Sequence, residues 1–388
     1  MHRLAHVRHA LPCGGGRGVF AGGFIRAGTV VLTEMPLVSL PDDAWDDARL
    51  PMHVSYALAI LSGTCGSPDE LLKQLGCLHP IDSSQVPESH RVALLAEYSP
   101  HFEALSTAAA AHGCTLGSSD DLYLLLCRLR FNCFSSGLYI TSSLVNHSCN
   151  PNCCKFSRTD TAFSLPVTEF VATRDIPEGE EITITYFGSV ELSHVCRTRR
   201  FMAQHCAELP ATPFPSPLDH LPEGSKDCDV DVLEQQLDAL APTVLSATAD
   251  DDVALVARLR GMYACAASVC GHGHIVCHRV MRLLVSANSV VIGNRRCGDS
   301  AGVSAALEIV RDGLVLLPAM ESYLGCEHCD IATLLLDISN AFEHLFASGD
   351  KSVYTIAGMQ TYSAASRKAY EMKQRSQRVQ RLYAAGST

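Results

Sequence analysis

Two segments in the middle of the chain constrain its fold more than any other feature. Residues 144–152 place the polar, turn-rich run NHSCNPN directly after an apolar Leu-Val pair. Residues 179–186, GEEITITY, predict a tight turn followed by an alternating strand that ends on a tyrosine. Either segment alone is weak evidence, because NHS is also a glycosylation sequon and GEE turns are common. The two in this order are far more specific.

The totals fit a folded chain of two or three domains. Its 388 residues are 47% hydrophobic and only 18% charged, which argues against disorder and allows a sizeable core. We find no uninterrupted apolar run of membrane-spanning length, and the first residues, MHRLAHVRHALP, lack the apolar centre of a secretory signal. The net charge of −11 disfavours a nucleic-acid partner and suits a basic polypeptide. We therefore expect protein partners, with no nucleic acid and no membrane.

The 18 cysteines are scattered through a core-forming chain. Without an export signal, reduced thiols in the cytoplasm or the nucleus are a better interpretation than a disulfide framework. The sequon at Asn146 is then not glycosylated, because that modification requires the secretory route. The two interpretations exclude each other.

Hydrophobic periodicity separates a β-rich part from a helical part. Residues 17–40 and 137–186 predict strands, and the Ala/Leu-rich stretch 52–130 between them predicts a helical insertion. A proline-rich stretch over 207–229 indicates a linker. We therefore predict one domain over 1–206 and, beyond the linker, a helical domain over 230–388. Its paired helices suggest a tetratricopeptide-like bundle, in which each pair needs neighbours to bury its apolar face.

Several segments resemble SET-and-MYND type protein-lysine methyltransferases. They are GRGVFA at 16–21, NCF at 132–134, GLYITSSLVNHSCNPNC at 137–153 and IPEGEEITITYFG at 176–188. Residues 323–350 are similar to the tetratricopeptide-like helices that close those proteins. The resemblance implies an α+β fold class: a β-rich SET fold with its two central segments threaded as a pseudoknot and a helical insertion, followed by an all-α tetratricopeptide-like bundle.

The same resemblance implies S-adenosylmethionine as cofactor and a lysine-containing protein or peptide as substrate. Methyl transfer to lysine is an in-line displacement, so the enzyme supplies alignment and electrostatics more than acid-base catalysis. Tyr186 matches the family's catalytic tyrosine, and Tyr139 is expected in the lysine channel. The expected cofactor contacts are Gly16, Arg17, Gly18, Asn132, Asn146 and His147.

Each of these assignments has a structural alternative. A tyrosine at a strand end is commonly packed on the core, which is the competing role for Tyr186. Asn146 and His147 can simply fix a turn, and we do not expect His147 to act as a general base. Tyr139 fits a core position as well as a channel position.

Two family features are missing from the sequence. The region expected to hold the MYND zinc finger offers Cys65 and Cys77 but no pair of C-x-x-C knuckles. After the tyrosine strand, Ala207 stands where the family has an aromatic residue beside the cofactor. Leu209 stands where the family has the first cysteine of its post-SET zinc site, which leaves Cys149, Cys206 and Cys228 without that site.

The pair Cys326 and Cys329, with His328 between them, lacks a second ligand pair at knuckle spacing, so we expect a helix-helix turn there and no metal site. The leading hypothesis is an S-adenosylmethionine-dependent protein-lysine methyltransferase. The alternatives are a catalytically inactive SET scaffold that binds partner proteins through its helical bundle, and a zinc-dependent interaction protein.

Overall fold

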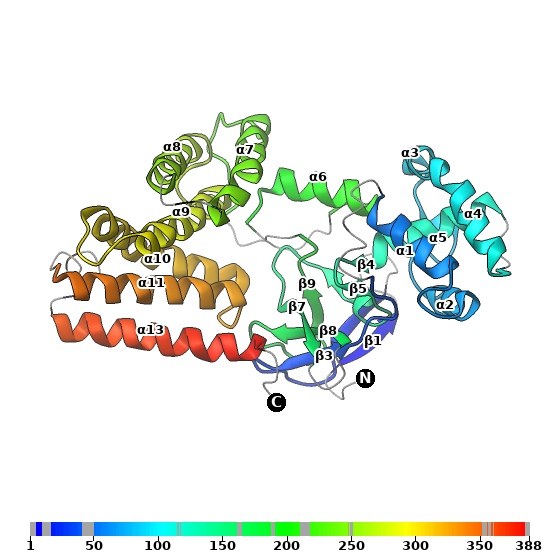
Figure 1. Ribbon diagram of the computed structural model, residues 1–388, viewed down its shortest axis with the longest axis horizontal. Helices are drawn as coiled ribbons and strands as arrows, with labels where there is room; N and C mark the ends of the chain where they lie inside the picture. Colours follow the sequence, from blue (N-terminus) through cyan, green and yellow to red (C-terminus); the bar gives the residue numbers. More distant parts are fainter. Residues whose placement is uncertain are drawn as a thin grey trace.

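The computed structural model describes residues 5–9, 17–40, 50–114, 116, 118–160, 165–187, 191–209, 218–246, 248, 251–350, 355, 358–359 and 361–384. A β-rich part lies between a helical insertion on one side and a layer of long C-terminal helices on the other (Figure 1). The predicted fold class is therefore confirmed: sheets and inserted helices come first, and an all-helical region follows.

Three small sheets form the β-rich part. Their strand orders are β1-β2-β9-β6, β3-β8-β7 and β4-β5. Strand β9 shows the period-2 pattern behind this arrangement: Ile182 and Ile184 are buried, whereas Glu181 and Thr183 are partly exposed. The strands are β1 Ala5–His9, β2 Arg17–Ala21, β3 Val30–Glu34, β4 Cys133–Phe134, β5 Gly137–Leu138, β6 Asn146–His147, β7 Cys153–Asp160, β8 Leu165–Ala172 and β9 Glu181–Ile184.

The helical insertion lies between β3 and β4 and has its own core, which includes the fully buried rings of Tyr56, Tyr98 and Tyr123. A capping box between Ser118 and Asp121 starts the last inserted helix. That helix ends at Asn132, immediately before β4, so its final turn borders the sheets. The helices are α1 Met52–Leu61, α2 Pro68–Leu75, α3 Glu88–Tyr98, α4 Phe102–Ala111 and α5 Ser119–Asn132.

The C-terminal helices form a layer in which consecutive helices pack on one another and share one apolar core. This nearest-neighbour stacking is the arrangement of helical repeats. Helix α6, His194–His205, spans from α7 of this layer to α5 of the helical insertion (Figure 1). The following helices are α7 Asp227–Leu245, α8 Asp252–Cys270, α9 Ile275–Asn294, α10 Ser300–Leu324, α11 Cys329–Ser348 and α13 Tyr362–Tyr383.

Two inter-helix turns share the same backbone conformation and the same helix cap. Gly271 after α8 and Gly325 after α10 have nearly the same backbone angles, φ +81° and ψ +149° against φ +84° and ψ +154°. Three residues later, His274 and His328 each accept the backbone N–H two residues ahead, at 3.2 and 3.1 Å, and so cap the next helix. The turn predicted around residues 326–329 is therefore confirmed.

Helices α8 and α9 are long and apolar enough, by length and composition alone, to cross a membrane. Neither helix is an uninterrupted apolar run, because Arg258 and Arg260 lie within α8 and Arg279 and Arg282 lie within α9. In the fold, 67% of the apolar stretch of α9 is buried against other parts of the chain, which is typical of a core helix.

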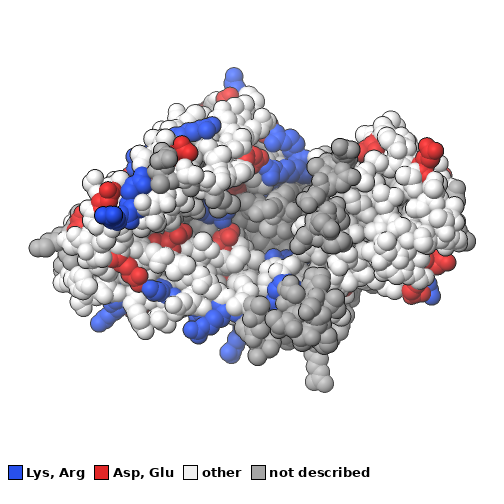
Figure 2. Space-filling view, viewed as in Figure 1, with Lys and Arg blue, Asp and Glu red and all other residues white. Residues whose placement is uncertain are grey.

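Acidic and basic side chains are interspersed over the outer face of the helical layer (Figure 2). Several of them pair across neighbouring helices, including Arg279 with Asp238 at 2.6 Å and Lys373 with Glu343 at 2.6 Å. The surface charge of this layer is therefore partly neutralised by pairing between its own helices.

The helical layer is joined to the sheets by tight contacts. A Cβ on Gly325 would lie 2.5 Å from the Thr173 carbonyl oxygen, so only glycine fits at this turn. The backbone N–H of Glu327 donates to the same oxygen at 3.2 Å. Nearby, the buried Glu191 carboxylate pairs with Arg282 at 2.9 Å and accepts the Tyr323 hydroxyl at 3.1 Å. The turn after α10 thus fixes the helices against the end of β8.

Candidate active site

The two segments singled out in the sequence lie side by side. Strand β6 pairs in parallel with β9, with Asn146 opposite Thr183 and His147 opposite Ile184. The buried side chain of Asn152 joins them further. Its amide nitrogen donates to Glu180 Oε1 and to the Glu181 carbonyl oxygen, both at 2.8 Å, and its amide oxygen accepts the Thr183 N–H at 2.9 Å.

Asn146 links this pair to β2. Its amide nitrogen donates to the Arg17 carbonyl oxygen at 2.8 Å and to Glu181 Oε1 at 2.7 Å. A Cβ on Gly18 would lie 2.5 Å from that carboxylate oxygen and 3.1 Å from the Asn146 nitrogen. The Glu181 carboxylate would have to shift to admit a side chain here, so the small size of Gly18 lets β2 lie close to the hydrogen-bonded pair. Gly16, the remaining cofactor contact expected in this loop, lies outside the described residues.

A first cavity of about 390 Å³ opens beside these residues. Its wall includes four of the predicted site residues, Arg17, Asn132, Asn146 and Tyr186. Although they are far apart in sequence, each lies at the start or end of an element or just after one, and the folded sheets bring these positions together. The volume is within the range of small-molecule sites.

Helix α6 supplies the aromatic wall of this cavity. Ala207 lines it without a ring, as the sequence predicted, but Phe201 and His205 line it as well. The His205 ring lies 4.7 Å from the Phe201 ring and 5.0 Å from the Tyr186 ring, measured between centroids. Nothing in the sequence motifs singled out these two residues, although their spacing of four places them on one face of a helix.

Tyr186 stands at the centre of this arrangement. Its hydroxyl donates to the Val145 carbonyl oxygen at 2.8 Å. Burial raises the pKa of the Tyr186 phenol, so the hydroxyl stays protonated near neutral pH. The group is therefore a fixed hydrogen-bonding dipole rather than a base.

A second cavity of about 520 Å³ shares Asn132, Tyr186 and His205 with the first. It is also lined by Phe134 and Phe187 from the β-rich part, and it extends to the start of α11 at residues 328–330. Tyr186 thus lies on the wall between two hollows, each of which can take a different ligand.

Lys155 of β7 lines the second cavity. Its ammonium nitrogen lies 4.3 Å from the Phe134 ring centroid and 3.0 Å from Ser136 Oγ, to which it donates. Burial lowers the pKa of Lys155 from 10.5 to about 8. The second cavity is therefore an environment in which an amine loses its proton more readily than in water.

His147 and Tyr139 are not among the described residues that line either cavity. His147 is buried, its Nδ1 accepts the Tyr186 N–H at 3.1 Å, and its ring packs 4.7 Å from that of Phe187. Burial lowers the pKa of His147 to about 3, which suits a neutral positioning group and not a base near pH 7. The fully buried Tyr139 donates its hydroxyl to the Ser136 carbonyl oxygen at 3.1 Å. The ligand-contacting roles of both residues remain predictions.

Among the described residues, one group of side chains could hold a metal ion, and it does not include Cys149, Cys206 or Cys228. That group consists of Cys154, His328 and Cys329. Cys149 lies beside His147, with its sulfur 3.5 Å from Nε2, and Cys206 ends helix α6.

The chain is similar to known proteins over part of its length. Residues 16–187 match the family model described as SET domain. The histone-lysine N-methyltransferase SMYD3 of Homo sapiens is 36% identical over 83 residues, which is 21% of this chain and 18% of that protein. The histone-lysine N-methyltransferase ASHR2 of Arabidopsis thaliana is 34% identical over 71 residues, 18% of this chain and 17% of that protein. These matches thus span less than a fifth of either relative.

Among solved structures, the SET domain of LSMT bound to lysine and AdoHcy aligns with a TM-score of 0.39 and 13% identity. The alignment covers 98% of this chain and 92% of that one.

Proposed function

We propose that this chain, whose residues 16–187 belong to the SET domain family, is an S-adenosylmethionine-dependent protein-lysine N-methyltransferase. One observation carries the proposal: Tyr186, the residue matched to the family's catalytic tyrosine, lies on the wall shared by two cavities. Methyl transfer requires a methyl donor and an amine to meet at one point from opposite sides. Two adjoining hollows with a common hydroxyl-bearing wall suit that requirement.

The residues of the first cavity fit the cofactor. Arg17 offers a cation for a carboxylate, and the rings of Phe201 and His205 offer an apolar wall for an aromatic base. His205 Nε2 is buried and has no hydrogen-bond partner among the described residues, so the site contains a polar atom that a ligand can satisfy. When bound, S-adenosylmethionine supplies an electrophilic methyl on a sulfonium.

The second cavity fits the substrate lysine. An amine must be neutral to attack, and the usual lysine pKa of about 10.4 leaves almost none in that state near pH 7. Burial in this cavity lowers the pKa of Lys155 to about 8, and the same desolvation would act on a substrate lysine placed there. The Tyr186 hydroxyl, held by the Val145 carbonyl, would orient the amine.

Calorimetry with S-adenosylmethionine, combined with transfer of labelled methyl to histones and a lysine peptide panel, tests the proposal. Tyr186→Phe should leave cofactor affinity within about threefold and reduce turnover at least about a hundredfold, because the hydroxyl acts mainly in the transition state. Tyr370→Phe, which alters an exposed ring on α13, is the matched control and should change neither. Absence of any binding heat at millimolar cofactor refutes the cofactor assignment.

Cofactor binding without transfer to any protein or peptide substrate would instead support a catalytically inactive SET scaffold. Turnover that survives Tyr186→Phe unchanged would show that another group orients the amine.

A further inference from the structure

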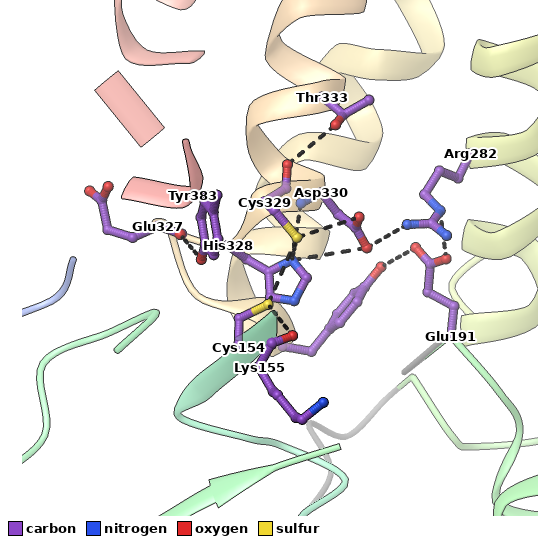
Figure 3. A network of polar contacts seen from close by, with 11 residues as sticks. Cys154, Lys155, Glu191, Arg282, Glu327, His328, Cys329, Asp330, Thr333 and Tyr383 are labelled. Atoms are coloured by element: carbon purple, nitrogen blue, oxygen red, sulfur yellow. Dashed lines mark hydrogen bonds and ion pairs between the residues drawn. The ribbon is translucent and has the colours of Figure 1, made fainter. Parts of the chain in front are cut away.

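A cluster of metal-binding side chains lies where the helical layer meets the sheets. Cys154 comes from β7, whereas His328 and Cys329 come from the turn and first residue of α11. Their ligand atoms all lie within 4.8 Å of one another. In Figure 3 the two sulfurs face each other with the His328 ring beside them. The sequence showed no further metal ligand for the 326–329 turn, because Cys154 lies 175 residues away from Cys329 along the chain.

Two of the three ligand-to-ligand distances in this group match a tetrahedral metal site. Zinc binds sulfur at about 2.3 Å and nitrogen at about 2.0–2.1 Å, so two sulfur ligands lie about 3.8 Å apart and a sulfur and a nitrogen about 3.6 Å apart. The Cys154 and Cys329 sulfurs are 3.8 Å apart, and Cys329 Sγ is 3.7 Å from His328 Nδ1. A disulfide needs its sulfurs at about 2.0 Å and would require the two elements to move together.

We propose that Cys154, His328 and Cys329 bind a zinc ion that joins the sheet to the helical layer. The site differs from the post-SET site that the sequence lacks, because Cys149, Cys206 and Cys228 take no part in it. It lies on the wall of the second cavity, so it would also fix one side of the proposed lysine-binding hollow.

Asp330 is not one of the three grouped ligands, but its carboxylate lies beside two of them and would complete the site as a fourth ligand after a small movement. Its Oδ1 lies 4.0 Å from Cys329 Sγ, and its Oδ2 lies 3.9 Å from His328 Nδ1. Arg282 pairs with Oδ2 at 2.7 Å and orients the carboxylate, as groups that hydrogen-bond to metal ligands commonly do. Two thiolates, a carboxylate and one zinc ion carry one net negative charge, which Arg282 offsets.

Binding through His328 Nδ1 would replace the hydrogen bond that this atom accepts from the Asp330 N–H. A helix cap contributes much less free energy than a structural zinc ion does in small zinc domains. The exchange therefore favours the metal. His274 makes the same cap in the matching turn before α9 but is not in the group of potential ligands. A substitution of His274 therefore tests the loss of a cap without the loss of a metal ligand.

The test is the zinc content and zinc affinity of the full chain, purified under a phosphine reductant and loaded from a zinc buffer. We expect one zinc ion per chain, and cobalt substitution should give thiolate-to-cobalt absorption bands. Cys154→Ser, Cys329→Ser and His328→Asn should each lower the zinc affinity at least about tenfold. Asparagine is a good helix cap, so His328→Asn removes the ligand and keeps the capping function.

Two controls match these variants. Cys326→Ser changes an exposed cysteine in the same turn that is not part of the cluster, and His274→Asn changes the equivalent cap. Both should retain the zinc ion. The proposal is overturned if the loaded chain holds no zinc, if either control loses as much zinc as Cys329→Ser, or if peptide mapping of chain purified without reductant shows a Cys154–Cys329 disulfide in place of the metal.

Discussion

Asn152→Ala tests how the two central segments hold the site together. The side chain is 1% exposed and makes three hydrogen bonds to β9 and the turn before it. Two of its partners are backbone groups, the Glu181 carbonyl and the Thr183 N–H. The third, Glu180 Oε1, also accepts from Arg174 at 2.6 Å and keeps that partner after the substitution.

The expected cost follows from these partners. Removing the partner of a buried polar group costs about 1–3 kcal/mol, so two backbone groups give roughly 2–6 kcal/mol of lost unfolding free energy. Asn150→Ala is the matched control because it lies in the same motif and no side-chain hydrogen bond of Asn150 is recorded among the described residues. The control should stay within about 0.5 kcal/mol of the wild type.

Urea denaturation followed by circular dichroism measures the global effect, and hydrogen exchange of the peptide covering 180–187 measures the local one. Exchange in that peptide should rise sharply in Asn152→Ala and remain unchanged in Asn150→Ala. If the two variants differ by less than 1 kcal/mol and exchange equally, Asn152 does not hold the segments together, and the account of the site given above is wrong.

Two further predictions concern stability. Burial lowers the folded-state pKa of Lys155 from 10.5 to about 8, so the burial penalty is fully present below pH 8 and disappears as the pH rises toward 10.5. Wild type should therefore gain about 2 kcal/mol relative to Lys155→Met between pH 8 and 10 in urea titrations, and a constant difference would contradict the shift. Gly325→Ala should cost about 2–4 kcal/mol more than Gly271→Ala in the same assay, because both strain the backbone but only Gly325 has a carbonyl oxygen at 2.5 Å from the added Cβ. Equal costs would show that the turn does not fix the helical layer.

The sequence was most informative where structure depends on local pattern. Alternating Ile182 and Ile184 fixed the face that β9 buries, and helical periodicity located the insertion and the C-terminal layer. The resemblance to SET-and-MYND type methyltransferases grouped Arg17, Asn132, Asn146 and Tyr186, which do line one cavity. Helix α9 is long and apolar enough to cross a membrane although charges interrupt it, and only the fold shows that most of its apolar stretch is buried.

Tertiary packing decided the rest, because residues distant in sequence meet only when elements dock. The sequence showed that Ala207 lacks a ring but could not show that α6 turns Phe201 and His205 toward the same cavity. The sequence placed His147 in a motif, but it did not show that the His147 ring packs in an aromatic cluster beside Phe187. Likewise Cys329 had no partner until the Gly325 turn docked on Thr173 and brought its sulfur 3.8 Å from Cys154. Periodicity encodes which face of an element is buried, whereas the contacts across a docked interface depend on how two such faces fit.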